Sequence, residues 1–333
     1  MAHGVMDEKI QTDWVPLRPQ MSRSGFENVI KRLSKYYRFV SMDEAVDMLA
    51  GRRPVTPRTL VVTFDDGYRN QVKHALPILQ RYKVPAMVFL ATGHVDRRKP
   101  FWFDRLDYAL QHTELSGKRI KVGGESIEFR SNDRDEVRRS YKRLRTAGKR
   151  VRRDDLEFTE EMEGICARLE IESGKRIHDI FEEDDWSSVL TWEEIREAAM
   201  EGVSFGSHTV DHVRLGLVEE EAAREQMLRS KNKIEEESGR PCRFLCYPNG
   251  SFNSRSAKIA RECGYEAGVS TLPGFNTVGE DLMALRRISL DEQTAGNILI
   301  QHVCMAVEPL KSIKRRLGGR EFGSPSVLQD FGD

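Results

Sequence analysis

Three short segments of this sequence carry groups that together could bind a metal ion and activate water. They hold an adjacent pair of carboxylates, a pair of imidazoles four residues apart and a Pro-Asn-Gly turn: Asp65 and Asp66, His208 and His212, and residues 248–250. One carboxylate with two imidazoles is a ligand set typical of catalytic metal sites, which leave coordination positions open for water and substrate. The segments therefore predict a metal-dependent hydrolase.

The two aspartates follow residues 59–64, a β-branched and nearly all-apolar run that predicts a strand buried on both faces. Adjacent strand residues face opposite ways, so both carboxylates can enter one pocket only if the strand ends at or near Phe64. Gly67 permits the turn that this requires. One carboxylate could then bind a cation while its neighbour acts on the metal's water, although the segment taken alone is more typical of an acidic turn.

The two histidines directly follow residues 203–207, which predict another strand. Residues four apart on a helical turn share one face, with Cβ atoms ~5–6 Å apart, a spacing that can chelate one ion. A single histidine would more often be a packing residue. The pair predicts that His208 and His212 bind the same metal.

The third segment follows a further predicted strand, residues 243–247, and so should lie at the same end of the sheet. Pro248 has no N–H, whereas the N–H of Asn249 is free to donate. Such a donor could stabilise the oxyanion that forms when water attacks an amide or ester carbonyl. We expect Asn249 and Tyr247 to contact the oxyanion or the substrate.

Alternating helices and strands must position these three segments. The predicted helices span about 26–36, 43–49, 71–82, 191–201, 219–238 and 254–263, and the predicted strands 59–64, 84–90, 203–207, 243–247, 267–271 and 285–290. Repeated β/α units with chemistry at the strand ends predict an α/β barrel.

The composition changes between about residues 96 and 190, where charged residues become frequent and β-branched residues rare. This segment predicts a charged helical insertion in that barrel. Its run of charges at 134–153 could be a solvated helical face or a binding patch. The aromatic residues at 101–103 could stack on sugar rings or attach the insertion to the barrel. We expect one elaborated domain over residues 1–316, followed by a loosely held tail at 317–333 that is rich in Gly, Ser and Pro.

The composition excludes several classes of protein. Lys and Arg number 53, as do Asp and Glu, so nucleic acid and anionic membranes are not expected as main partners. The five cysteines show no CxxC spacing, which argues against both a disulfide framework and a thiolate zinc site. No apolar run approaches the ~18 residues of a membrane span, and no secretory signal opens the sequence, so a cytoplasmic location is expected.

Taken in this order, the three segments resemble the motifs of the polysaccharide deacetylase family, also called family 4 carbohydrate esterases. The resemblance covers about residues 59–95 and 190–290, and residues 3–5 resemble the family's Tyr-His-x-Val opening in shortened form. It implies a distorted (β/α) barrel with seven or eight strands. In the third motif Asn249 stands where the family often has an aromatic residue.

The resemblance also implies roles for particular residues. In the family's first motif the first Asp is the catalytic base and the second a metal ligand, which are Asp65 and Asp66 here, with the histidines of the second motif as the other ligands. Arg287 resembles an Arg that orients the base in the subgroup of exopolysaccharide deacetylases. His302 resembles the family's general acid in sequence only, because its spacing from Arg287 is short and residues 295–307 also predict a helix.

The resulting hypothesis is an enzyme that uses a divalent metal, most simply Zn²⁺, to remove acetyl groups from N-acetylated sugars of a poly- or oligosaccharide. Two alternatives stay open at this point. One is a metal-dependent amidase for a small non-sugar amide, and the other is a carbohydrate-binding or scaffolding relative with a vestigial metal site. The sequence does not indicate which glycan is bound, whether the acetyl group lies on nitrogen or oxygen, or the oligomeric state.

Overall fold

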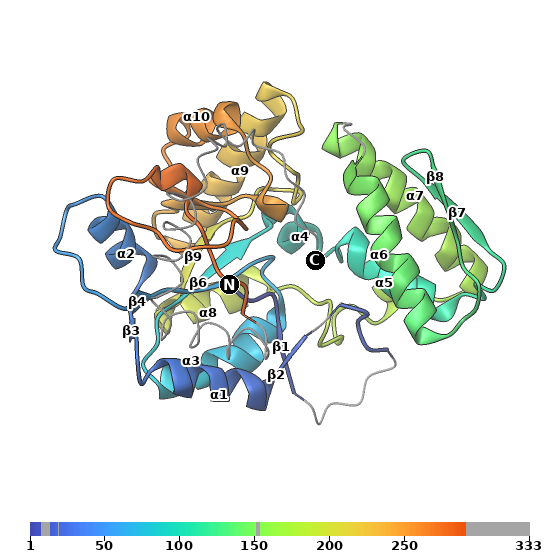
Figure 1. The fold of residues 1–333 in the computed structure, drawn as a ribbon, viewed down its shortest axis with the longest axis horizontal. Coiled ribbons are helices and arrows are strands. Elements are labelled where there is room, and N and C mark those ends of the chain that lie inside the picture. The colour runs from blue at the N-terminus through green and yellow to red at the C-terminus, as the bar shows by residue number, and fades with distance from the viewer. Residues whose placement is uncertain (8–13, 19, 151–153, 291–333) are drawn as a thin grey trace, which may run out of the picture.

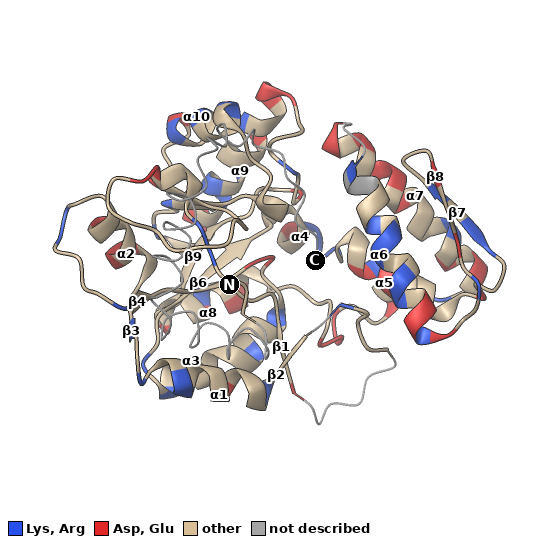
Figure 2. Cartoon of the chain, viewed as in Figure 1, with Lys and Arg blue, Asp and Glu red and all other residues tan. Residues whose placement is uncertain are grey.

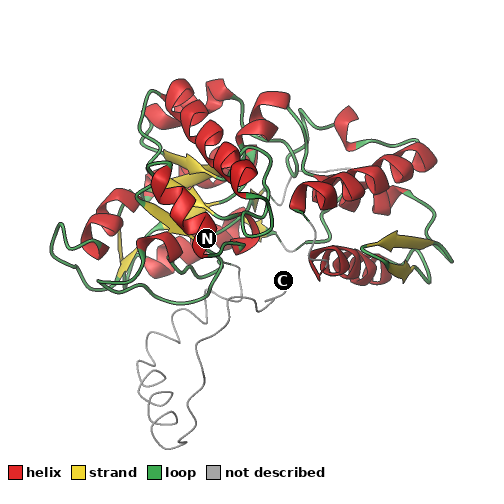
Figure 3. Cartoon of the chain, turned by 90° about the horizontal axis from the view of Figure 1, so that it is seen from above, coloured by secondary structure: helices red, strands yellow, loops and turns green. Residues whose placement is uncertain are grey.

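The computed structural model describes residues 1–7, 14–18, 20–150 and 154–290. These residues form a barrel and a second, mostly helical lobe at its side, as Figure 1 and the turned view in Figure 3 both show. His302 and the predicted tail at 317–333 lie outside the described residues.

A parallel sheet forms the centre of the barrel. Its strands run in the order β11 (Ala267–Val269), β10 (Phe244–Cys246), β9 (Ser204–Ser207), β6 (Ala86–Leu90) and β5 (Val62–Phe64), and every pairing is parallel. Nearly all of the strand residues are buried, as their continuous apolar runs predict for a sheet covered on both faces. Parallel neighbours require crossover connections, which the intervening helices supply.

Two irregular segments extend this sheet and join its edges. Residues 1–2 bridge parallel to β5, and the segment 285–290 bridges parallel to β11. The N–H of Leu290 donates to the carbonyl oxygen of Met1 over 2.7 Å, so the two outer segments meet. The predicted distorted α/β barrel is thus confirmed. The strand predicted at 285–290 is wrong in detail, because this segment makes one bridge only, at Leu285.

Helices cover both faces of the sheet. The main core cluster joins side chains of the sheet to α1 (Arg23–Leu33), α3 (Leu76–Arg81), α8 (Trp192–Met200), α9 (Glu220–Ser238) and α10 (Ser254–Glu262). A second cluster joins the alternate strand residues, such as Met87 and Phe89, to α2 (Met42–Leu49). The alternation of side chains along each strand therefore divides the core in two.

Short elements complete the barrel lobe. The strand predicted at 59–64 is in fact two strands, because β4 (Thr59–Leu60) pairs with β3 (Arg38–Phe39) in a separate sheet. A small parallel pair joins β1 (Val5–Met6) to β2 (Met21–Ser22). The turn of π-helix Gln71–Ala75, the helix α4 (Thr92–Arg97) and the 3-10 turns Pro248–Gly250 and Leu282–Ala284 connect the rest.

The insertion has its own hydrophobic core and is not entirely helical. It contains α5 (Trp102–His112), α6 (Arg134–Arg150), α7 (Asp155–Ser173) and the 3-10 turn Ile177–Asp179, together with an antiparallel hairpin of β7 (Arg119–Val122) and β8 (Glu125–Glu128). The hairpin corrects the all-helical expectation. Gly123 and Gly124 both have positive φ, which two-residue hairpin turns of type I′ require.

Charged side chains are spread over the helices of the insertion, as Figure 2 shows for α6 and α7. Many of them are exposed, and several form exposed ion pairs within one helix, such as Arg138 with Asp135. Much of this charge is therefore solvated. No described helix combines the length and the apolar content that crossing a membrane requires.

Candidate active site

The chemical groups gather where three strands of the central sheet end. Asp65 and Asp66 follow β5, His208 follows β9, and Cys246 is the last residue of β10. Because the strands are parallel, their carboxyl ends meet at one edge of the sheet. The Nδ1 of His208 lies 2.8 Å from the carbonyl oxygen of Cys246, which ties two of these strand ends together.

Asp66, His208 and His212 converge on one point. Oδ1 of Asp66 lies 3.5 Å from Nε2 of His208 and 3.3 Å from Nε2 of His212. The prospective ligand atoms of the three side chains all lie within 4.8 Å of one another. This is the spatial grouping that the sequence predicts, although Asp66 lies more than 140 positions from the two histidines along the chain.

The backbone reaches this arrangement by a route that the sequence analysis did not predict. His208 and His212 lie on a loop and not on a helical turn, with φ of 66° at Thr209 and 55° at His212. Asp66 also has positive φ, at 75°. Such backbone angles are uncommon outside glycine and persist only where the surrounding structure imposes them. The helical geometry proposed for the histidine pair is therefore wrong, while their convergence is real.

The donor set fits a divalent cation. The contact between Nδ1 of His208 and a backbone carbonyl leaves Nε2 directed at Asp66, as is usual for a histidine that binds a metal through Nε2. Two imidazole nitrogens and one carboxylate oxygen suit zinc and similar ions. The ring of His212 is held from the other side by Phe101 and Phe103, at centroid distances of 5.4 and 5.5 Å.

The electrostatics of the cluster also favour a cation. Burial tends to raise the pKa of Asp66, but its hydrogen bonds to His208 and His212 lower that pKa well below the ordinary value. Burial opposes protonation of His208, yet its contacts with Cys246 and Asp66 raise its pKa well above the ordinary value. Burial lowers the pKa of His212 in spite of Asp66. An ionised carboxylate thus holds positive charge at this point, and a metal ion can replace the proton.

Asp65 is held in a bidentate ion pair with Arg287. The Nη1 and Nη2 atoms of Arg287 lie 2.6 and 2.7 Å from the two carboxylate oxygens, and both side chains are buried. Arg287 is itself fixed by the carbonyl oxygen of Ser270 at 2.8 Å and by Sγ of Cys246 at 3.1 Å. Burial tends to raise the pKa of Asp65, but the guanidinium outweighs it and lowers that pKa below the ordinary range. Asp65 is therefore a fixed, ionised carboxylate beside the metal-binding cluster.

The third motif places its two predicted residues differently. Asn249 is exposed and has φ of 54°, and among the described residues its N–H makes no hydrogen bond. The ring of Tyr247 is fully buried and stacks on Phe252 at 4.7 Å, while its N–H donates to the carbonyl of Val269. Asn249 therefore keeps the free donor that the sequence predicted. The expectation that Tyr247 contacts substrate is wrong, because its ring fills the core against Gly268.

The aromatic residues of the insertion are packing residues. Phe101 and Phe103 are 1% and 5% exposed and stack on each other with ring centroids 5.0 Å apart. Phe101 also stacks on His94 at 3.9 Å. Since both rings also contact His212, they attach the insertion to the candidate metal centre and leave no face open for a sugar.

His3 is a residue of this site to which the sequence analysis gave no role. Its side chain is exposed at the surface. Partial desolvation by the surrounding residues lowers its pKa, whereas the nearby carboxylates of Asp66 and Asp65 tend to raise that pKa. Nε2 of Gln71 donates to the carbonyl oxygens of both His3 and Asp65 and so fixes the two segments together. The signal in the sequence was the resemblance of residues 3–5 to the family's opening motif.

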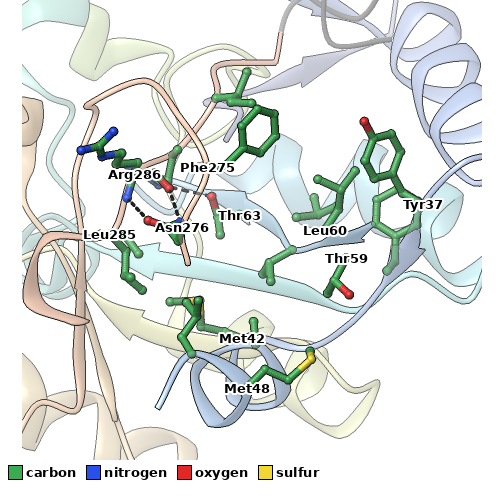
Figure 4. Close-up of a pocket in the computed structure, with 18 of the residues that line it drawn as sticks. Tyr37, Met42, Met48, Thr59, Leu60, Thr63, Phe275, Asn276, Leu285 and Arg286 are labelled. Carbon is green, nitrogen blue, oxygen red and sulfur yellow. Dashed lines mark hydrogen bonds between the residues drawn. The ribbon is translucent and has the colours of Figure 1, made fainter. Parts of the chain in front are cut away.

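A mostly apolar cavity lies next to this cluster in the described part of the barrel. It has a volume of about 510 Å³ and lies between α1, α2, β4 and the loop before Leu285, as Figure 4 shows. Its walls are mostly apolar, with Tyr37, Met42 and Leu60 among the labelled residues. The cavity shares Thr63 and Arg287 with the polar cluster but none of the metal-ligand candidates. The chemistry is therefore concentrated at the strand ends and not in this cavity.

Comparison with known families agrees with this arrangement. The family model described as polysaccharide deacetylase matches residues 52–268. YxkH of Bacillus subtilis (strain 168), whose given name places it among polysaccharide deacetylases, is 31% identical over 108 residues, which are 32% of this chain and 39% of YxkH. The poly-beta-1,6-N-acetyl-D-glucosamine N-deacetylase of Staphylococcus aureus (strain MRSA252) is 31% identical over 124 residues, 37% of this chain and 40% of that protein.

The matched stretches thus span about two fifths of the length of these curated relatives. Solved structures match over more of the chain. Streptococcus pyogenes deacetylase PplD in complex with acetate gives a TM-score of 0.57 at 17% identity, covering 90% of this chain and 94% of that one. IcaB from Ammonifex degensii gives 0.54 at 19% identity, covering 89% and 95%. At these identities the likeness establishes the barrel fold.

Proposed function

This chain belongs to the polysaccharide deacetylase family, and we propose that it hydrolyses acetyl groups from N-acetylated sugars of a poly- or oligosaccharide. The observation that carries the proposal is the convergence of Asp66, His208 and His212 beside the ionised Asp65. A vestigial site would not require a clamped carboxylate next to a complete ligand set. The named activity of the staphylococcal relative supports an N-acetylated sugar as the substrate class.

We assign metal binding to Asp66, His208 and His212, with Zn²⁺ as the ion that suits these donors best. A divalent cation at this point would act as a Lewis acid and lower the pKa of water. The protein's own contribution is a buried site whose carboxylate is already ionised. Tight packing by Phe101 and Phe103 holds the His212 ring in position.

Asp65 is the proposed general base. Its carboxylate accepts a proton from the attacking water while the water oxygen bonds to the acetyl carbonyl carbon. The Arg287 clamp makes Asp65 a weaker base than a free carboxylate, but it keeps the group ionised and correctly oriented. That compromise suits a site where a neighbouring cation has already made the water more acidic.

The remaining steps use two exposed groups. The free N–H of Asn249 would stabilise the oxyanion of the tetrahedral intermediate. When the C–N bond breaks, acetate leaves and the sugar amine needs a proton. We assign its delivery to His3, which lies in electrostatic range of both Asp65 and Asp66.

The cytoplasmic location expected from the sequence stays a prediction.

The test is release of acetate from N-acetylglucosamine oligomers by the full chain. Acetate should appear with the metal-loaded protein, stop after treatment with a chelator and return when Zn²⁺ is added back. A small acetylated amide without a sugar ring serves as the comparison substrate. Release from that amide but from no N-acetylated saccharide would overturn the proposal in favour of a small-molecule amidase.

A further inference from the structure

Two arginines lie against one aromatic ring beside the candidate metal centre. The guanidinium carbon of Arg18 lies 4.7 Å from the centroid of the Phe103 ring, and that of Arg145 lies 5.9 Å from it. The same ring contacts His212 with the centroids 5.5 Å apart. Both positive charges are thus separated from a metal-ligand candidate by a single side chain.

The two arginines differ in how their charge is balanced. Arg18 forms an ion pair with Asp104, and its Nη2 also lies 3.4 Å from the hydroxyl of Tyr68, the residue that follows the Asp-Asp-Gly motif. Arg145 comes from α6 and packs on Tyr141 at 5.3 Å. Within the described part of the chain it has no ion pair and no hydrogen bond, and its buried Nε has no acceptor.

This lack of a partner contrasts with two buried arginines that pair with carboxylates of α7. Arg105 on the neighbouring helix α5 is paired with both Glu163 and Glu170, and Arg214 is paired with Asp155. Acidic residues are as numerous as basic ones in the chain, so counter-charges are available. A partly desolvated cation without a counter-charge is unfavourable, and the aromatic contacts of Arg145 offset only part of that cost.

An anion from outside the chain would complete the arrangement. A guanidinium binds carboxylates and phosphates through two parallel hydrogen bonds, and Arg145 is sufficiently exposed to meet a ligand from solvent. The Phe103 ring contacts both Arg145 and His212, so Arg145 lies one aromatic side chain away from the candidate metal centre, on its insertion side. A sugar at the reactive position and a charged neighbour on the same oligosaccharide could therefore be bound together.

We propose that Arg145, assisted by Arg18, is a subsite for an anionic group on the saccharide substrate, a carboxylate or a phosphate next to the N-acetylated sugar. This inference rests on the proposed function and narrows its substrate class to acidic glycans. Arg145 is the specificity-determining residue of the pair, because Asp104 already neutralises Arg18.

The first experiment measures binding and does not depend on turnover. Three oligosaccharides of equal length are titrated into the full chain: one that alternates uronic acid with N-acetylglucosamine, one that carries a phosphate substituent, and a neutral N-acetylglucosamine oligomer. Wild type should bind at least one acidic oligomer about tenfold or more tightly than the neutral one, with the preference weakening at high salt. The two acidic probes distinguish carboxylate from phosphate.

Arg145→Gln should bring the ratio of acidic to neutral affinity close to one, and Arg145→Lys should keep part of the preference. Arg143→Gln is the matched control, because Arg143 is exposed on the same helix and has no aromatic contact among those described. Equal affinity of wild type for all three oligomers would overturn the inference, as would an unchanged ratio in Arg145→Gln with native thermal unfolding.

Turnover separates this inference from the proposed function. If wild type binds acidic oligomers preferentially but releases no acetate from any of them, the subsite stands and the proposed reaction fails. If acetate is released equally well from neutral and acidic oligomers, the reaction stands and the subsite fails. For an active enzyme, Arg145→Gln should raise KM for the preferred acidic oligomer about tenfold or more relative to the neutral one, with a smaller change in kcat.

Discussion

Two pairs of buried aspartates show how the two lobes treat the same side chain. Asp65 and Asp66 at the strand ends are 3% and 2% exposed, and Asp104 and Asp107 on α5 of the insertion are 1% and 0% exposed. Burial tends to raise the pKa of the first pair, but Arg287 beside Asp65 and the two imidazoles beside Asp66 outweigh it and lower both pKa values below the ordinary range. In the insertion, burial dominates and raises the pKa of Asp104 to about 6 and that of Asp107 to about 7.

Between Asp65 and Asp107 the difference lies in the partners and not in the depth of burial, whereas at Asp104 burial outweighs the ion pair with Arg18. Asp65 receives two hydrogen bonds from Arg287, whereas Asp107 receives only neutral donors, the N–H of Leu17 at 2.9 Å and Nε2 of Gln111 at 2.7 Å. Burial alone therefore favours a neutral carboxyl, and a carboxylate available for chemistry requires a positive charge built in beside it. Substitutions of Asp65, Arg287 and Asp107 test this difference between the two lobes.

The largest effect should come from the strand-end pair. Asp65→Asn should reduce acetate release by about 10²–10⁴-fold, because it removes the general base and keeps the shape of the side chain. Bound metal, measured by elemental analysis, should stay close to that of wild type. His208→Ala should lose both metal and activity. Ordinary turnover in Asp65→Asn would show that another group accepts the proton.

Arg287→Gln should come next, because it leaves Asp65 buried without its counter-charge. The free energy of unfolding of the metal-free protein at pH 7 should fall by about 3–5 kcal/mol. The folded pKa of Asp65 lies below its unfolded value, so the pair contributes stability above about pH 4, and this is lost as pH falls.

The gap between wild type and Arg287→Gln should therefore narrow as pH is lowered below about 4. Urea unfolding at several pH values measures this gap. A gap that stays constant with pH would mean that Arg287 acts through packing alone.

Asp107 should have a smaller effect on stability, and its effect should depend on pH in the opposite direction to that of Asp65. Its folded pKa of about 7 exceeds the unfolded value of about 3.9, so the folded state binds a proton more tightly than the unfolded state. Its contribution to stability should be fully present below about pH 4 and be lost as pH rises to about 7, by at most ~4 kcal/mol. Asp107→Asn should flatten this part of the profile, as measured by urea unfolding. A steeper loss in the variant would contradict the assignment.

The smallest effect is expected at an exposed ion pair of the insertion. Asp135 and Arg138 are three residues apart on α6, and their side chains are 64% and 61% exposed. Asp135→Asn should change the free energy of unfolding by no more than about 0.5 kcal/mol, because water and salt screen the pair. A change above 1 kcal/mol in the free energy of unfolding, measured with urea, would contradict this. It would mean that an exposed ion pair can contribute as much to stability as a buried carboxylate does.

Local patterns in the sequence were sufficient to predict much of the barrel. Apolar runs predicted four of the five central strands within two residues of their observed ends, whereas the run 59–64 is divided between two sheets. A strand ending at Phe64 was required for Asp65 and Asp66 to share a pocket, and β5 ends there. The Gly-Gly pair at 123–124 is also a turn signal in the sequence, although the charged pattern around it predicts helix. These features depend on side-chain alternation and turn chemistry, which act over a few residues.

The tertiary structure alone decided which distant groups meet. The sequence presented Arg287 as a candidate by resemblance, but its two hydrogen bonds to Asp65 depend on a barrel that brings residues 222 positions apart into contact. The same holds for His3 beside the aspartates, for the buried ring of Tyr247 and for Arg145, which has no ion-pair partner among the residues that the structure describes. Periodicity determines which face of an element is apolar, whereas the position of a charge relative to its counter-charge depends on how the elements pack, and that packing sets each pKa.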